Sequence, residues 1–221
     1  MSSNSSPRTR VVRIRLGAAA LAVAGILFVL YPAIRPYSDE ASLQGAAAFS
    51  STAWVVAHIL AMVGFTLLLL GLLGVNVALQ STPVEGRSFG ALVVGLLGVG
   101  LTLPFYGGED FGLHAIGQEA LRQHSTSLMD LAPVIRGGPQ LYMFLVGLVL
   151  IAASAVMVAT AVWKSGTFAR WSGVPLAIAF ALYIPQFFGP QVIRVAHGLL
   201  VTAGCVLLAL ALWRQPRRAG L

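Results

Sequence analysis

Apolar residues along the chain fall into six long runs that short polar stretches separate. Each run is close to the ~20 residues that an α-helix needs to cross ~30 Å of hydrocarbon. The pattern predicts membrane-spanning helices at about 14–33, 53–79, 89–106, 140–163, 170–187 and 191–213. The predicted fold class is therefore all-α, a polytopic helical membrane protein with six transmembrane helices.

The polar ends of the chain set the limits of this domain. Residues 1–13 are predicted to form an N-terminal tail, 14–213 the six-helix domain and 214–221 a basic C-terminal tail. The opening "MSSNSSPRTRVVRIR" resembles the start of a secretory signal. The apolar stretch "LAVAGILFVLYP" that follows has no well-placed small-residue cleavage site, so we interpret it as part of an uncleaved first span.

Composition agrees with a membrane protein. Hydrophobic residues make up 57% of the chain and charged residues 10%, and the mean hydropathy is +0.85. The expected partner is the lipid bilayer. The net charge of +7 does not indicate nucleic acid, because the basic residues flank the apolar runs, where membrane topology requires them. The single cysteine, Cys205, excludes an internal disulfide, Cys-x-x-Cys redox chemistry and covalent c-type haem attachment.

The distribution of charge predicts an orientation, since cytoplasmic flanks collect Lys and Arg. With the N-terminus inside, the inner side receives Arg8, Arg10, Arg13, Arg15, Arg87, Lys164, Arg170, Arg214, Arg217 and Arg218. The outer side receives Arg35, Arg122, Arg136 and Arg194. Of the acids only Glu85 falls inside, whereas Asp39, Glu40, Glu109, Asp110, Glu119 and Asp130 fall outside. We therefore predict a multi-pass protein of the cell membrane with both termini in the cytoplasm.

Two of the predicted helices begin with similar sequences. They are "GPQLYMFLVGL" at 138–148 and "GPQVIRVAHGL" at 189–199, and the "VAH" of the second recurs in "VAHIL" at 56–60. One interpretation is three tandem helix hairpins in parallel orientation, as in transporters built from repeats. The other is chance similarity between apolar helices. If the repeat is real, His58 and His197 occupy equivalent positions near the outer ends of their helices.

The stretch "PFYGGEDFGLHAIGQE" at 104–119 carries an unusual share of the charge. Glycine accepts the left-handed conformation that ends helices, so Gly107 and Gly108 are predicted to terminate the third helix. Asp110 is then expected to cap a short interfacial helix at about 111–124, with its apolar residues turned towards lipid or the bundle.

Ionisable residues in the outer half are the candidates for a functional site, because such residues are costly at membrane depth. They are His58, Glu109, Asp110, His114, Arg194 and His197. The predicted ligand-binding set consists of Glu109, Asp110, His114 and Arg194. In this set Arg194 binds the negative charge of the ligand and a histidine carries a proton. These residues also have purely structural interpretations. The acids can be solvated loop residues, the arginine can snorkel to the headgroups, and the histidines can form interhelical hydrogen bonds.

A cofactor is the alternative interpretation of the histidines. His58 and His197 lie on different helices at equal depth and can ligate haem b axially, with Arg194 near a propionate. The three imidazoles and two carboxylates can also coordinate a divalent metal such as zinc or iron. No His-Glu-x-x-His, phosphate loop or serine elbow is present, so no catalytic residue or reaction is predicted.

Three functional classes follow from these observations. The first is a membrane protein with an outward-facing polar site that binds or transports a small molecule or ion. The second is a haem b- or metal-binding membrane oxidoreductase or hydrolase that uses His58 and His197. The third is a structural subunit whose small-residue helix faces bind another copy or a partner membrane protein.

Overall fold

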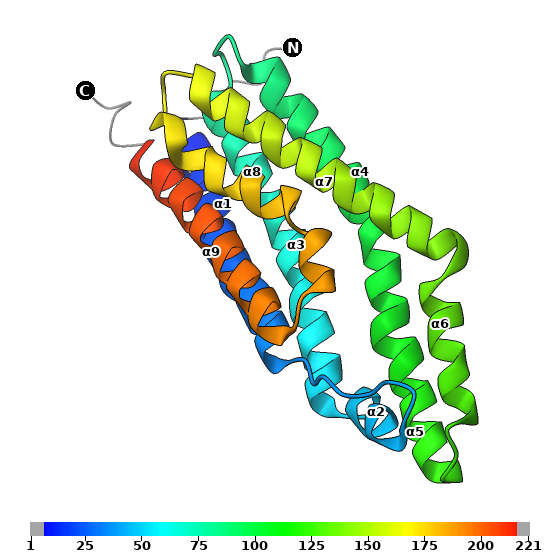
Figure 1. Cartoon of the computed structure of the whole chain (residues 1–221). Helices are drawn as coiled ribbons and strands as arrows, with labels where there is room; N and C mark the ends of the chain where they lie inside the picture. Colours follow the sequence, from blue (N-terminus) through cyan, green and yellow to red (C-terminus); the bar gives the residue numbers. More distant parts are fainter. Residues whose placement is uncertain (1–6, 216–221) are drawn as a thin grey trace.

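The computed structural model describes residues 7–215, and the elements in this part of the chain are helical (Figure 1). The long helices are α1 (Pro7–Ile34), α3 (Thr52–Leu79), α4 (Glu85–Gly107), α7 (Gly138–Lys164) and α9 (Gln191–Arg214). Each of these belongs to a helical stretch that is long and apolar enough to cross a membrane. The all-α membrane class is confirmed.

The ends of the chain differ in detail from the predicted tails. Helix α1 already begins at Pro7, so part of the segment predicted as an N-terminal tail is helical. Helix α9 ends at Arg214, next to the predicted C-terminal tail. Most of that tail, including Arg217 and Arg218, lies outside the described residues.

The fifth predicted span, 170–187, is not one continuous helix. It consists of the 3-10 turn η3 (Arg170–Gly173), the short helix α8 (Val174–Ala181) and the 3-10 turn η4 (Pro185–Phe188). Proline has no N–H to continue the helical hydrogen bonds, so α8 cannot extend through Pro185. Five helices of the described chain therefore qualify as spans, and the fifth predicted span, 170–187, is a short, irregular segment. The chain still returns along it, and the start of α1 and the end of α9 lie at the same end of the bundle (Figure 1).

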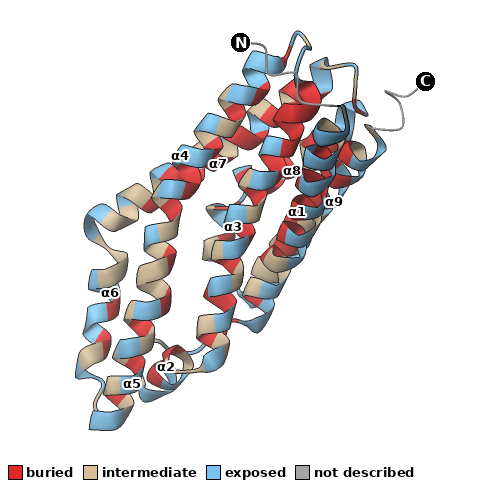
Figure 2. Ribbon diagram, turned by 180° about the vertical axis from the view of Figure 1, so that it is seen from behind, coloured by how far each residue is buried: buried red, intermediate tan, exposed pale blue. Residues whose placement is uncertain are grey.

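The helices close into a ring. Each of α1, α3, α4, α7, α8 and α9 packs against the next, and α9 packs back against α1. Buried residues follow the sides of the helices that face the bundle, and exposed residues follow the outer sides (Figure 2). The short α8 is thus one wall of the ring between α7 and α9.

Glycines set the closest helix crossings, as small residues do in lipid. Where α1 crosses α3, a Cβ on Gly17 would lie 2.6 Å from the Cα of Gly74. Where α4 crosses α7, a Cβ on Gly98 would lie 2.8 Å from the carbonyl oxygen of Gly147. These two crossings leave no room for a side chain.

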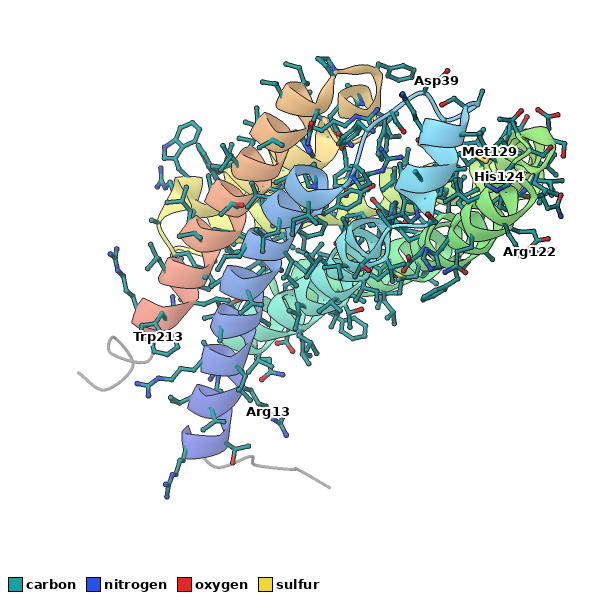
Figure 3. The ribbon with its side chains drawn as sticks, turned by 90° about the horizontal axis from the view of Figure 1, so that it is seen from below. Arg13, Asp39, Arg122, His124, Met129 and Trp213 are labelled. Carbon is teal, nitrogen blue, oxygen red and sulfur yellow. The ribbon has the colours of Figure 1, made fainter. Side chains whose placement is uncertain are left out.

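A cap of short helices covers the end opposite the start of α1 and the end of α9. It contains α2 (Leu43–Phe49), α5 (Leu113–Gln123), the 3-10 turn η2 (Ser127–Asp130) and α6 (Leu131–Arg136) (Figure 1). The cap has its own apolar core, formed by Ala46, Phe49, Trp54, Leu113, Ala120, Met129 and Ala132. In the view from below, Asp39, Arg122, His124 and Met129 lie at this end, and Arg13 and Trp213 lie at the other (Figure 3).

The predicted break before the interfacial helix is wrong. Gly108 has φ −64°, in the right-handed region, and the chain continues from α4 through a π-helical turn, η1 (Gly108–Gly112), directly into α5. Asp110 therefore lies inside a helical turn and does not cap a new helix. Helix α5 itself has the predicted polarity, since Leu113 is buried and Gln123 is exposed.

The glycine crossing of α4 and α7 predicts opposite outcomes for two glycines of one helix. Gly98→Ala should lower the free energy of unfolding by about 1–3 kcal/mol, because its Cβ would overlap the α7 backbone. Gly100→Ala should leave it unchanged or raise it by up to about 1 kcal/mol, because nothing lies within 4 Å of that Cβ and alanine favours the helix. Thermal unfolding in mild detergent measures both, and equal effects would contradict this packing.

Candidate functional site

A chain of charged side chains joins the cap to the bundle. The Arg35 guanidinium donates to Glu40 Oε1 at 3.0 Å. Arg136, at the end of α6, donates both to Glu40 and to the two carboxylate oxygens of Glu109. On its other side, Glu109 Oε2 lies 3.4 Å from His58 Nε2. One network thus links the loop after α1 with α6, η1 and α3.

The π turn positions Glu109 for this network. A π turn accommodates an extra residue, which shifts the side chains around the helix axis relative to an uninterrupted α-helix. The Glu109 side chain is only 12% exposed, and its backbone carbonyl accepts a hydrogen bond from the Trp54 indole at 2.9 Å. The Arg35 guanidinium lies over the same indole at 4.5 Å, in a cation–π contact. Trp54 therefore supports both ends of the network.

Asp110 shares the π turn but not the network. The residue is 0% exposed, and neither carboxylate oxygen has a hydrogen-bond partner among the residues described. His58 and His114 are close enough to act on its charge. A buried carboxyl group without a partner is costly, and within residues 7–215 only the Asp110 side chain has buried oxygens without one.

His58 and His197 are not brought into contact with each other. The Nδ1–H of His58 donates to the Trp54 carbonyl at 2.8 Å, and its Nε2 faces Glu109. The Nε2–H of His197 donates to the Ala179 carbonyl at 2.8 Å. Both Nε2 atoms are therefore occupied by protein groups, and an axial haem pair would require each to exchange that partner.

The Ala179 contact gives His197 a structural role. In a continuous helix the Tyr183 N–H would bond to the Ala179 carbonyl, but here it bonds to Phe180 in the last turn of α8. His197 supplies the missing donor. Its ring also packs edge-on against Tyr183, with centroids 5.1 Å apart.

His114 belongs to the cap rather than to the charged network. Its Nδ1–H donates to the Phe49 carbonyl of α2 at 2.9 Å, and Gln118 bonds to its other ring nitrogen at 3.0 Å. Within residues 7–215, no group of three or more His, Cys, Asp or Glu side chains is close enough to hold a metal ion.

A pocket of about 550 Å³ opens beside the network. Its polar lining consists of Tyr31, Arg35, Tyr106, Glu109, Arg136 and Arg194. Its apolar lining includes Phe105, Pro133, Leu141, Phe144, Leu145, Ile184, Phe187 and Phe188. The volume falls in the range of sites for small organic molecules. The pocket thus combines three guanidinium groups with an extensive apolar and aromatic wall.

The three arginines of the pocket differ in how their charge is matched. Glu40 matches Arg35, and Glu40 and Glu109 match Arg136. Burial alone would lower the pKa of Arg136, but these two carboxylates outweigh it and raise the pKa above its ordinary value. Arg194 has no carboxylate partner in the described part of the chain. It donates to the backbone carbonyls of Gly189 at 3.1 Å and Phe187 at 2.7 Å.

Sequence analysis did not place Arg35, Glu40 or Arg136 in the site. A usable signal was present, because basic residues are scarce on the predicted outer side. Three of those four arginines, Arg35, Arg136 and Arg194, line the pocket, and the fourth, Arg122, forms an exposed pair with Glu119 on α5.

Comparison with protein-family models found no match, and neither the curated proteins nor the solved structures gave a significant one. The fold and the site therefore define the class by themselves. The chain is a helical membrane protein whose candidate site is the pocket lined by Glu109 and the three arginines.

The network predicts that Glu109 is needed for stability and Glu119 is not. Glu109→Gln keeps the shape but removes the charge that Arg136 and His58 face, so the free energy of unfolding should fall by about 2 kcal/mol. Glu119→Gln removes a carboxylate from an exposed pair and should have little effect. Thermal unfolding in detergent compares them, and a loss confined to Glu119→Gln would refute the proposed importance of the network.

Proposed function

We propose that this membrane protein binds a small anionic molecule in the pocket beside Glu109 and presents or transports it from that side of the membrane. The proposal rests on the hydrogen-bond partners of Arg194. The other two guanidinium groups of the pocket are paired with carboxylates, whereas Arg194 bonds only to backbone carbonyls in the described chain. The pocket therefore has a cation in excess.

Arg194 also has donors to spare. A guanidinium has five N–H groups, and its bonds to Phe187 and Gly189 use two of them. The remaining donors can bind a carboxylate or phosphate in the forked geometry that arginine favours, without loss of either backbone bond. The aromatic rings of Tyr37 and Phe187 lie within 6 Å of the guanidinium and limit its movement.

We also propose that the pocket faces outwards and that both termini are cytoplasmic. In support, the basic positions Arg8, Arg10, Arg13, Arg15, Arg87, Lys164, Arg170 and Arg214 flank the helix ends opposite the cap. Positive charge of this kind favours the cytoplasmic side.

Paired reporter fusions at Leu221 test this orientation. A fluorescent reporter that folds in the cytoplasm should be active there, and a phosphatase that requires export should be inactive, because the basic flanks keep this end inside. The reverse pattern would place the pocket on the cytoplasmic side and overturn the orientation.

Two arginine variants test the anion site. Arg194→Gln removes the unmatched charge and should weaken binding of phenyl phosphate or benzoate roughly 10- to 100-fold, since a charge-assisted contact contributes about 1.5–3 kcal/mol. Arg122→Gln, on the exposed face of α5, serves as the matched control and should leave binding unchanged. Ligand-dependent thermal shifts of the purified protein measure the affinities.

Benzyltrimethylammonium provides the charge control for the ligand. Equal stabilisation by this cation and by phenyl phosphate would contradict an anion site. An Arg194→Gln protein that binds phenyl phosphate as well as the original protein would do the same.

A further inference from the structure

We infer that the anion carries a hydrocarbon chain and enters the pocket sideways from the bilayer, so that the ligand class is a single-chain acidic lipid. This inference rests on the proposed anion site and specifies its ligand. It follows from how charge is distributed in the pocket, how deep each part lies, and where the ring of helices is thinnest.

The pocket separates charge from apolar surface. The charged part of the lining consists of three members of the network, Arg35, Arg136 and Glu109, together with Arg194. The rest of the lining is mainly apolar and includes Phe144 and Leu145. An inorganic anion would contact the first part and leave the apolar wall uncovered. A ligand with a charged head and a hydrocarbon chain covers both parts.

The positions of the lining residues along α7 and α9 bear on how the ligand's charged head group and its hydrocarbon chain are placed. Arg194 is three residues beyond the start of α9, about 4.5 Å from that end. Phe144 and Leu145 are six and seven residues beyond the start of α7, about 10 Å from that end. Arg194 is thus closer to the start of its helix than Phe144 and Leu145 are to the start of theirs. Phe187, which contacts both Arg194 and Phe144, joins the charged part of the pocket to the apolar wall. A lipid whose head group lies at Arg194 and whose chain lies along this wall has the same arrangement.

The ring of helices is thinnest beside the pocket. Helix α8 ends at Ala181, so in this half of the bundle the wall between α7 and α9 is formed by η4, a single 3-10 turn. Phe188 of η4 lines the pocket and is nevertheless 89% exposed. Val192 at the start of α9 and Tyr142 at the start of α7 are 75% and 70% exposed. Large apolar side chains at this edge suit contact with acyl chains, not with water.

Comparison of an anion that resides in the bilayer with water-soluble anions tests whether the ligand is a lipid that enters from the bilayer. The full chain is placed in nanodiscs of phosphatidylcholine, and its melting temperature is measured with lysophosphatidate in the disc or with butyl phosphate or inorganic phosphate in the buffer. We expect lysophosphatidate at low mole fraction to raise the melting temperature, and lysophosphatidylcholine, which has no net charge, to leave it unchanged. Butyl phosphate should require roughly 100-fold higher concentration to give the same shift.

Two serine variants of α7 test the apolar wall. Leu145→Ser alters the pocket lining and should reduce the affinity for lysophosphatidate by roughly tenfold while leaving butyl phosphate binding in place, which also reports that the variant is folded. Val146→Ser, on the adjacent and 52% exposed position, is the matched control and should change neither affinity.

The outcomes separate this inference from the proposed function. If inorganic or butyl phosphate binds as tightly as lysophosphatidate, and Arg194→Gln abolishes that binding, the anion site stands and the lipid inference fails. If no anion shifts the melting temperature, or if Arg194→Gln has no effect on any of them, the proposed function fails as well.

Discussion

A charged carboxylate among apolar helices is costly unless positive charge lies beside it, and the matching of Glu109 organises the surrounding structure. Arg136 meets it by bringing α6 against η1, and through Glu40 it also binds the loop after α1. The loop is in turn held by Arg35, whose guanidinium lies over Trp54. The cap is thus attached to the bundle by matched charge as well as by its small apolar core, and the pocket forms beside this attachment.

Much of the bundle could be predicted from hydropathy, because the long helices of a membrane protein are set by the thickness of the hydrocarbon layer. The segment 170–187 could not, since an apolar run has the same composition whether its backbone is continuous or broken. What decides the difference is whether neighbours satisfy the freed carbonyl groups. His197 does so for Ala179, and Arg194 does so for Phe187 and Gly189. Similarly, glycines at 107 and 108 permit a helix end but do not require one.

The candidate site was predictable only in part, for a related reason. Scarcity of charge pointed to Glu109 and Arg194, and both line one pocket, with His58 next to Glu109. The same criterion grouped His114 and His197 with them, yet their ring nitrogens bond to backbone carbonyls elsewhere. Arg136 escaped notice because it lies 27 residues from Glu109, and periodicity within one helix carries no information about such a pair. From the sequence alone, a polar side chain that bonds to a free backbone carbonyl cannot be distinguished from one that binds a ligand.

The broken segment around α8 bears on how the protein enters the membrane. An eight-residue helix with 3-10 turns on both sides has backbone groups that lipid cannot satisfy, and these groups are tolerated only where protein surrounds them. Residues of α9 supply donors to this segment, and α7 packs along its other side. The segment is therefore not expected to move from the translocon into lipid by itself. We therefore expect it to enter the bilayer together with α9, as a single hairpin.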